Sequence, residues 1–470
     1  MTHLSLEDFE REALATLMDF ARIPSLSPLF EEKWADTGHI EAAVDLITAW
    51  AATRELADVT IEVHRLEGRT PVVLITVPST APADVTGTVI LYGHLDKQPP
   101  LGEWSEGLDP FEPVRRGDQI FARGIADDGY SAFSALLALE ALEANHIAHG
   151  RCVVLIEASE ESGSTDLEAH LAALSDHLGD VELLICLDSG AITYDRLWVT
   201  TSLRGVLNAE ITVSVLTQAQ HSGSASGVAP SSFRILRQLL DRIEDPVTGE
   251  ILLPEFHAPI PSSAVAAAES VAAEFGDVAA SGLPTVEGLN LMGISAADRI
   301  LGRTWRPTLS VIGMGGIPQP EIAGNVLRPS TTCVISCRLP PTLNYELALS
   351  ALVTALTSNI PHNAHVTVSA HGANGWAAPE TAPWLSAALE EASLDAFGNR
   401  VGFTGEGGSI PFLGSLAVQY PKVQFVATGV LGPHSNAHGI DEMLDLPTVV
   451  SITNAVATIL QAHANHQERS

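Results

Sequence analysis

The stretch Thr88-Val89-Ile90-Leu91-Tyr92-Gly93-His94-Leu95-Asp96 carries both a strand and its functional end. Its first five residues are β-branched, apolar or aromatic, which predicts a buried strand over 88–92. His94 and Asp96 follow that strand two residues apart, so they point the same way from an extended chain. A carboxylate beside a buried strand is costly unless it is paired or binds a cation. This stretch therefore indicates a polar site at a strand end.

Strands and helices alternate on both sides of this stretch. The sequence predicts further strands at 59–63, 72–77, 152–157 and 183–187, and helices at 5–23, 38–54 and 130–144. Such alternation is typical of an α/β sandwich with a largely parallel sheet. In sheets of this kind, functional residues gather where the strands end.

The pattern changes after residue 205. The next elements are predicted at 206–215, 231–243, 308–313, 331–338, 343–358 and 364–370. Their order is β-α-β-β-α-β, a ferredoxin-like unit, interrupted by an Ala/Pro-rich insertion over 245–306. The α/β pattern resumes with a helix at 380–397, a strand at 422–428 and a helix at 446–462. We therefore expect a catalytic domain in two pieces, 1–205 and 373–470, around an inserted domain, 206–372.

Composition excludes several classes of protein. The chain has 470 residues, 46% hydrophobic and 17% charged, which is typical of globular proteins and not of disordered ones. Its net charge of −33 would repel phosphates, so we expect no nucleic-acid partner, and it gives no reason to expect binding to an anionic membrane.

The N-terminus and the cysteines predict a cytoplasmic protein. Residues 1–8 have no basic start, apolar core or small-residue cleavage site, so we expect no signal peptide. Cys152, Cys186, Cys333 and Cys337 lie in apolar, strand-like sequence, which predicts buried free thiols in a reducing compartment.

Four more segments place metal-ligand side chains at or just beyond predicted elements. They are Asp127-Asp128 before the helix at 130–144, Glu160-Glu161 after the strand at 152–157, Asp188 after the strand at 183–187, and His434 after the strand at 422–428. Each segment alone is a weak signal. Together, carboxylates and imidazoles at one sheet edge would suit Zn²⁺, Mn²⁺ or Co²⁺.

Six phrases in order resemble one family. They are Tyr92-Gly93-His94-Leu95-Asp96, Arg123-Gly124-Ile125-Ala126-Asp127-Asp128, Glu160-Glu161-Ser162-Gly163-Ser164, His221-Ser222-Gly223, Gly249-Glu250-Ile251-Leu252-Leu253-Pro254 and Glu406-Gly407-Gly408-Ser409-Ile410-Pro411. The chain resembles the di-zinc metallopeptidases that include carnosinase, carboxypeptidase G, succinyl-diaminopimelate desuccinylase and aminoacylase, and above all their cytosolic carnosinase-like branch. The resemblance implies a three-layer phosphorylase/hydrolase-like catalytic domain with an inserted ferredoxin-like lid or dimerisation domain.

The same resemblance implies roles for the strand-end residues. It assigns two Zn²⁺ per subunit, with Mn²⁺ or Co²⁺ as alternatives. Asp96 would hold His94, Glu160 would be the general base, and the Asp127–Asp128 peptide would be cis. The implied metal ligands are His94 and Asp188 for one ion, Glu161 and His434 for the other, and Asp127 as the bridge. His438 is interpreted as a plain loop histidine, because the family's ligand directly precedes a serine.

In the inserted domain, the resemblance implies a substrate site shared within a homodimer. His221 would reach the partner subunit's site and stabilise the oxyanion, and Asn325 with Arg338 would hold the substrate's terminal carboxylate. Gly408 would also contact substrate. Gly129-Tyr130 departs from the family's usual Lys-Gly, which weakens any transfer of substrate identity from a relative.

The expected activity is metal-dependent hydrolysis of dipeptides or short peptides with a free C-terminal carboxylate. The same residues would serve an N-acyl amino acid deacylase or a carbamoyl amidase, which a substrate panel would separate. A catalytically inactive binding protein on this fold is the alternative from another class, and the full set of ligands with Glu160 argues against it. A G-x-S-x-G serine nucleophile motif is absent from the sequence.

Overall fold

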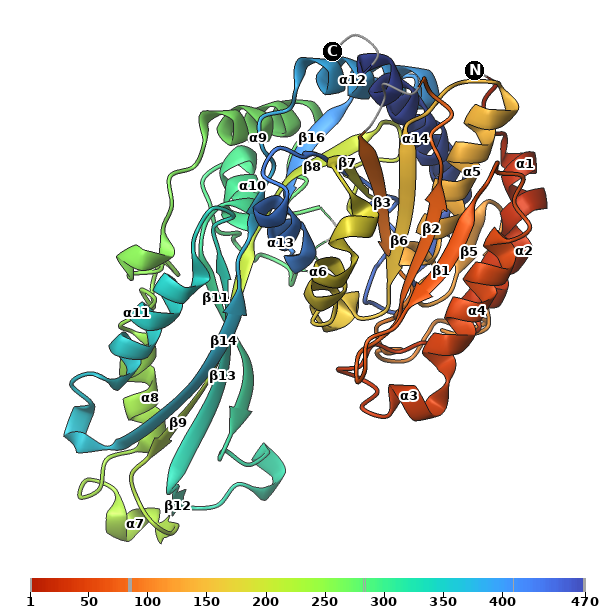
Figure 1. Cartoon of the computed structure of the whole chain (residues 1–470). Helices are drawn as coiled ribbons and strands as arrows, with labels where there is room; N and C mark the ends of the chain where they lie inside the picture. The colour runs from red at the N-terminus through yellow and green to blue at the C-terminus, as the bar shows by residue number, and fades with distance from the viewer. Residues whose placement is uncertain (1, 83–86, 282, 284, 409, 468–470) are drawn as a thin grey trace. The chain divides into compact units, whose positions relative to one another are not determined.

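The computed structural model describes residues 2–82, 87–281, 283, 285–408 and 410–467. It divides into two compact units, each described here by itself (Figure 1). The first comprises Met1–Thr201, Ala378–Thr404 and Ser415–Ser470; the second comprises Ser202–Ala377 and Gly405–Gly414. The sequence pattern predicted an inserted domain at 206–372. It did not predict that Gly405–Gly414, later in the chain, would belong to the same compact unit.

A nine-stranded sheet has most of its strands in the first unit. Its order is β1-β2-β6-β3-β7-β17-β8-β15, with β16 beside β8. The strands are β1 (Thr60–His64), β2 (Val72–Val77), β3 (Thr88–His94), β6 (Arg151–Glu157), β7 (Val181–Cys186), β8 (Trp198–Leu203), β15 (Trp376–Ala377), β16 (Gly402–Glu406) and β17 (Gln424–Ala427). The central β6-β3-β7-β17 pairs are parallel, whereas β1, β2, β8 and β15 pair antiparallel. The prediction of a largely parallel sheet therefore holds at the centre, where the functional strand ends lie.

Helices pack against this sheet through one apolar core. Fully buried side chains of β3, β6 and β7 contact those of α5 and α14, and α5 is buried along most of its length. The helices are α1 (Leu6–Phe9), α2 (Ala15–Ala21), α3 (Trp34–Thr37), α4 (His39–Ala51), α5 (Ser131–Ala144), α6 (Leu167–Leu178), α12 (Pro383–Phe397), α13 (Pro411–Gln419) and α14 (Leu446–Gln467). A π-helical segment, Glu10–Leu14, joins α1 to α2, so the predicted first helix is divided into three pieces.

A small three-stranded sheet positions two of the site's loops. Its order is β18-β5-β4, from β18 (Met443–Asp445), β5 (Gln119–Phe121) and β4 (Val114–Arg116). β5 leads into the Asp127 segment, and β18 follows the loop that carries both His434 and His438. The pairing of β18 with β5 therefore brings two distant stretches of sequence together.

The second unit confirms the ferredoxin-like pattern. Its antiparallel sheet has the order β11-β13-β9-β14, from β9 (Gly205–Ser214), β11 (Thr308–Gly315), β13 (Ser330–Leu339) and β14 (His365–Ala373). Helices α8 (Ser232–Leu240) and α11 (Tyr345–Thr357) cover one face, as Figure 1 shows. Alternate residues of β9 and β13 are buried because only that face packs on helices.

The insertion within this unit is helical. It contains α9 (Ser262–Phe275) and α10 (Ala296–Thr304), which agrees with its low β character in the sequence. A two-stranded ribbon of β10 (Gln220–His221) and β12 (Val326–Leu327), followed by α7 (Ser222–Ala225), completes the unit.

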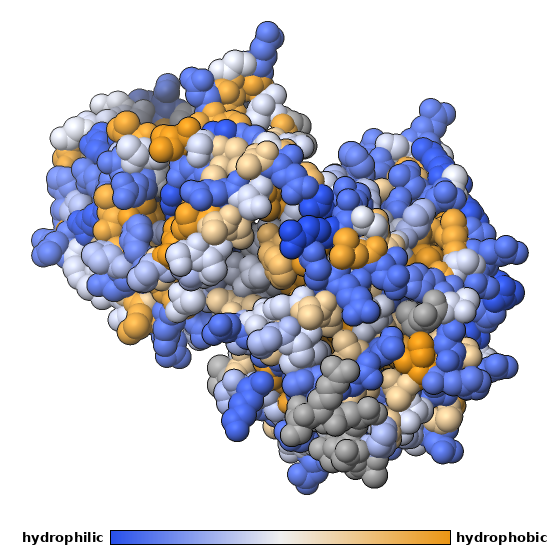
Figure 2. Space-filling view, turned by 90° about the horizontal axis from the view of Figure 1, so that it is seen from above, coloured by the Kyte–Doolittle hydropathy of each residue, from blue (hydrophilic) through white to orange (hydrophobic). Residues whose placement is uncertain are grey.

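The surface is largely hydrophilic with scattered apolar groups, as the face in Figure 2 shows. On the edge strand β11, Val311, Ile312 and Met314 are 50%, 60% and 45% exposed, which is unusual for an edge. None of the helices in the described part of the chain has the length and apolarity to cross a membrane.

Candidate metal centre

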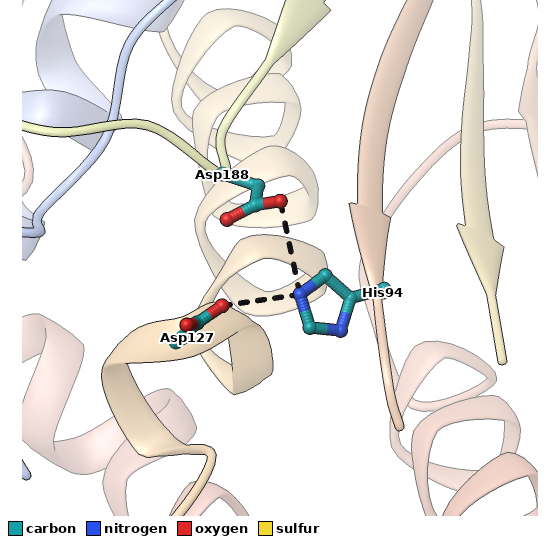
Figure 3. Close-up of side chains that lie close together, drawn as sticks. All are labelled: His94, Asp127 and Asp188. Atoms are coloured by element: carbon teal, nitrogen blue, oxygen red, sulfur yellow. Dashed lines mark hydrogen bonds and ion pairs between the residues drawn. The ribbon is translucent and has the colours of Figure 1, made fainter. Parts of the chain in front are cut away.

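The predicted strand-end residues meet at the carboxyl edge of the central strands. β3 ends at His94, the turn after β6 carries Glu160 and Glu161, and Asp188 follows β7 by two residues. Because these strands are parallel neighbours, their carboxyl ends lie side by side. Figure 3 shows His94 and Asp188 from this edge facing Asp127, which lies in the short helical segment Ile125–Gly129 before α5.

His94, Asp127 and Asp188 form the first group of ligand atoms. His94 Nε2 lies 3.2 Å from Asp127 Oδ1 and 3.8 Å from Asp188 Oδ2. All three residues are buried, with 1%, 6% and 7% of their surface exposed. Two carboxylates and an imidazole so close together in a buried site need a compensating positive charge.

A buried ion pair holds the Asp127 segment in place. Glu442 is fully buried, and its carboxylate accepts hydrogen bonds from the backbone N–H groups of Gly124, Ala126 and Asp127 at 2.9, 3.0 and 3.2 Å. Arg123 Nη1 donates to the same carboxylate at 2.7 Å. The Asp127–Asp128 peptide is cis, as expected.

Asp127, Glu161 and His438 form a second group. His438 Nε2 lies 3.0 Å from Asp127 Oδ2 and 3.2 Å from Glu161 Oε2. Gln98 Nε2 donates to Glu161 Oε2 at 2.7 Å and so fixes that carboxylate. Asp127 therefore presents one oxygen to each group, which is the arrangement of a bridging ligand.

The structure places His438, and not His434, beside Asp127 and Glu161, while the ligand role of His434 stays a prediction. His434 is exposed; its backbone N–H donates to Tyr194 Oη at 3.3 Å, and its ring faces the Tyr194 ring. His438 is carried to Asp127 because the next residue, Gly439, accepts a hydrogen bond from Arg123 and Glu442 binds the Asp127 segment. The short distance from His438 to strand β18 was the sequence signal that could have identified it.

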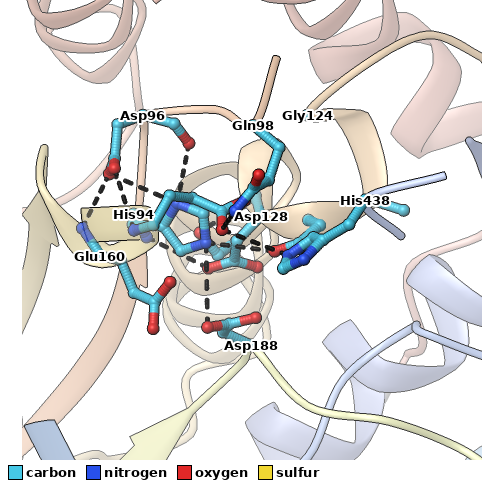
Figure 4. A network of polar contacts seen from close by, with 12 residues as sticks. His94, Asp96, Gln98, Gly124, Asp128, Glu160, Asp188 and His438 are labelled. Atoms are coloured by element: carbon cyan, nitrogen blue, oxygen red, sulfur yellow. Dashed lines mark hydrogen bonds and ion pairs between the residues drawn. The ribbon is translucent and has the colours of Figure 1, made fainter. Parts of the chain in front are cut away.

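Asp96 orients both sides of the centre (Figure 4). Its carboxylate oxygens accept hydrogen bonds from the backbone N–H groups of Glu160 and Glu161, both at 3.1 Å. Its backbone oxygen lies 3.0 Å and its Oδ1 3.5 Å from His94 Nδ1. Asp96 thus contacts the His94 ring and also holds the turn that presents the two glutamates.

Electrostatics make Glu160 a proton acceptor that can also hold a proton. Desolvation, followed by the negative charge of Asp188, raises the pKa of Glu160 well above its usual value. Against the effect of burial, hydrogen bonds to Asp127 and Glu161 raise the pKa of His438 to about 11. Without a cation, the carboxylates of Asp127 and Glu161 thus favour the protonated form of His438.

The donor chemistry of both groups fits divalent cations. Each supplies one imidazole and two carboxylates with ligand atoms within 4.8 Å of one another, and neither contains a thiolate. Oxygen and nitrogen donors in this combination suit Zn²⁺, Mn²⁺ or Co²⁺. A cation in each group would also supply the positive charge that the carboxylates require.

The substrate residues predicted in the second unit do not all lie together. Ser222 N–H donates to the backbone oxygen of Asn325 at 2.9 Å, so His221 and Asn325 are neighbours on the β10–β12 ribbon. Arg338 is at the far end of β13, and a strand rises about 3.3 Å per residue, so roughly 26 Å separates it from Ser330 at the near end. Asn325 and Arg338 are therefore far apart within one subunit, and their joint binding of a carboxylate stays a prediction. Gly408 is exposed, with open space where a side chain would be.

Sequence comparison identifies the class of protein. The profile of Peptidase family M20/M25/M40 matches residues 90–462, most of the chain. The chain belongs to this family of peptidases.

Among its relatives are two dipeptidases. It is 26% identical over 380 residues to a cysteinylglycine-S-conjugate dipeptidase of Corynebacterium striatum, covering 79% of this chain and 80% of the relative. It is also 26% identical over 396 residues to the Cys-Gly metallodipeptidase DUG1 of Saccharomyces cerevisiae, covering 81% and 80%.

Solved structures share the whole fold. The dipeptidase Dug1p from Saccharomyces cerevisiae superposes with a TM-score of 0.76 at 22% identity, covering 98% of this chain and 97% of that one. Human carnosine dipeptidase 1 gives a TM-score of 0.76 at 19% identity with the same coverage. These likenesses confirm the predicted α/β architecture with an inserted domain.

Proposed function

We propose that the protein is a two-metal dipeptidase that hydrolyses dipeptides or short peptides with a free C-terminal carboxylate. One observation carries the proposal: Asp127 directs its two oxygens to two separate His–carboxylate groups, with Glu160 in the turn beside them. His94 and Asp188 would hold one cation, Glu161 and His438 the other, and Asp127 both. Zn²⁺ is the expected ion.

In the mechanism, the chain's own residues position and move a proton. When bound, a metal pair lowers the pKa of an attacking water and polarises the scissile carbonyl. Glu160 accepts the proton of that water and then donates it to the leaving amine. Its raised pKa favours this second role, since burial stabilises the protonated carboxyl that donates to the amine. Asp96 keeps Glu160 in place through the backbone of the turn.

The two relatives named as dipeptidases support a short substrate. They act, by their names, on cysteinylglycine compounds, and we propose a dipeptide of the same length for this chain. Arg338 would bind the substrate's C-terminal carboxylate, because a guanidinium binds a carboxylate with two parallel hydrogen bonds. Gly408 would leave room for the substrate's backbone.

The separation of Asn325 from Arg338 supports a homodimer. His221 and Asn325 share one ribbon, so both would enter the partner subunit's site while Arg338 serves its own. The exposed apolar side chains of β11 offer a surface that would be buried by a second copy. The four free and buried cysteines support a cytoplasmic location.

An activity assay of the metal-reconstituted protein tests this function. It compares dipeptides with the matching N-acetyl amino acids as substrates. We expect turnover of dipeptides with two metal ions per chain by mass spectrometry. Preference for N-acetyl amino acids would instead identify a deacylase, and a chain that binds metal without any turnover would be a binding protein.

A further inference from the structure

Glu157 is a buried carboxyl group that the proposed mechanism does not use. It is the last residue of β6, and none of its surface is exposed. Three hydroxyl groups donate hydrogen bonds to its carboxylate: Tyr92 at 2.6 Å and Ser164 at 2.7 Å to Oε1, and Ser159 at 3.1 Å to Oε2. A buried carboxylate is costly unless its oxygens are bonded, so Glu157 and these three hydroxyls form one connected unit.

Two of these donors are the ends of the turn that carries Glu160 and Glu161. Ser159 directly precedes the short helical segment Glu160–Ser162, and Ser164 follows that segment after one residue. The backbone N–H of Ser164 donates to the backbone oxygen of Ser159 at 2.9 Å, which closes the turn. Both serines are buried. One carboxylate therefore binds the turn at both of its ends.

The conformation of Ser164 requires support of this kind. Its φ of 52° lies in the left-handed region, which favours glycine because a Cβ atom there approaches the backbone. Such a conformation persists where the surrounding contacts hold it. The hydrogen bond from Ser164 Oγ to Glu157 is thus placed where the turn is least favourable by itself.

The position of the Glu160 carboxylate depends on this turn. Within the described part of the chain, no hydrogen bond fixes its oxygens, and Figure 4 shows its side chain extending from a backbone that contacts Asp96. Glu161, by contrast, is also held at its carboxylate by Gln98. A displaced turn would therefore affect Glu160 more than Glu161.

Tyr92 connects Glu157 to the core of the first unit. It is fully buried in β3, which pairs in parallel with β6. The Glu157 oxygen that accepts from Tyr92 also accepts from Ser164. The turn is thus tied to the central strands through side chains as well as through the backbone.

We propose that Glu157 is a positioning residue for proton transfer, which holds Glu160 in place by binding Ser159 and Ser164. The inference rests on the proposed function, in which Glu160 accepts the proton of water and donates it to the leaving amine. Proton transfer depends steeply on position, and a displacement of about 1 Å can lower the rate about 100-fold. Loss of the serine hydroxyls should therefore lower kcat and leave the binding of substrate unchanged.

Ser159→Ala and Ser164→Ala test this role in the metal-loaded protein. Each should lower kcat by about 10- to 100-fold, with KM changed by less than about twofold and two metal ions retained. Ser134→Ala removes an equally buried hydroxyl, bonded to Thr453 in the same unit, and should keep the wild-type kcat. Glu157→Gln should lower kcat in the same range, because it replaces one accepting oxygen with a donor nitrogen. If Glu157→Gln does not fold, the serine variants carry the test.

The same serine substitutions in Glu160→Gln protein separate positioning from a general structural effect. Because the serines are proposed to act through Glu160, they should not lower the residual kcat of that variant further. A loss as large as in the wild-type background would overturn the proposal, and so would an unchanged kcat in both single variants.

Crystal structures of the metal-loaded wild type and of the Ser159→Ala/Ser164→Ala double variant give a readout without turnover. A displacement of the Glu160 carboxyl group by about 1 Å or more supports the proposal, and an unchanged position overturns it. Lack of turnover of every dipeptide by the wild type contradicts the proposed function alone.

Discussion

Asp127 directs one oxygen to each group of ligand atoms, and Glu160 is the residue to which we assign the acid–base chemistry. The side chain of Asp127 is held by backbone bonds to a buried ion pair, not by its own conformational preference. Glu160 is held through its backbone by Asp96, so its carboxyl group can exchange a proton without losing its position. Metal binding and proton transfer can therefore be separated by single substitutions.

Glu160→Gln should keep both metal ions and lose turnover. The amide has nearly the size of the carboxyl but cannot accept the proton of water, and loss of a general base typically lowers kcat by about 10²- to 10⁴-fold. Steady-state kinetics with metal analysis of the same sample measures both effects. A kcat near that of the wild type would show that another group is the base.

His438→Ala and His434→Ala form a matched pair that decides the second ligand. The first should reduce bound metal from two ions per chain to one and lower kcat, because Asp127 and Glu161 lose their shared imidazole. The second removes an exposed side chain and should keep two ions. Retention of both ions in His438→Ala with loss of one in His434→Ala would restore the original assignment.

At the scale of elements, the strand ends could be predicted and the loops could not. His94, Glu161 and Asp188 follow apolar strands, and parallel strands bring their ends to one edge whatever the details of packing. His438 stands in a loop whose path depends on Arg123 and Glu442, more than 300 positions apart in the sequence. Local sequence does not encode such a contact, so the position of His438 beside Asp127 could not be predicted.

The contact between β1 and α6 makes stability depend on pH. His64 Nδ1 lies 2.7 Å from His170 Nδ1, and His170 Nε2 lies 2.9 Å from the backbone oxygen of Thr70. His170 therefore donates from Nε2 and accepts from His64 at Nδ1, which requires a neutral ring. Burial lowers the pKa of His170 from its ordinary value of 6.5. His170 therefore binds a proton more readily in the unfolded chain than in the folded one. The stability that the His64–His170 contact contributes is present above pH 6.5 and is lost as pH falls below it.

Denaturant unfolding of wild type and His170→Gln between pH 5 and 8 measures this effect. The wild type should lose more stability on acidification, and the two stabilities should converge below about pH 6. His365→Gln, which removes an exposed histidine of β14, should follow the wild-type curve. Parallel curves for wild type and His170→Gln would show that the histidine pair is not the source.

At the scale of the whole molecule, an inserted domain could be predicted because the pattern of strands and helices changes near residue 205. The substrate residues of the inserted domain could be assigned to its elements but not placed in space, since Asn325 precedes β12 and Arg338 lies near the far end of β13. In the proposed homodimer, the two residues would serve the sites of different subunits.

Mixing two inactive variants tests the shared site. Subunit exchange between Glu160→Gln and His221→Ala chains should restore activity, because a mixed dimer has one site with intact Glu160 and a partner's intact His221. With random exchange about half of the dimers are mixed, so roughly a quarter of the wild-type sites should be active. If exchange is demonstrated and activity stays absent, His221 does not act across the dimer.

Anomalous diffraction at the zinc edge from crystals of zinc-loaded protein tests the two-metal centre most directly. The account predicts two peaks flanking the Asp127 carboxylate, one contacted by His94 and Asp188 and the other by Glu161 and His438. A single peak, or a second peak bound by His434 in place of His438, would contradict it.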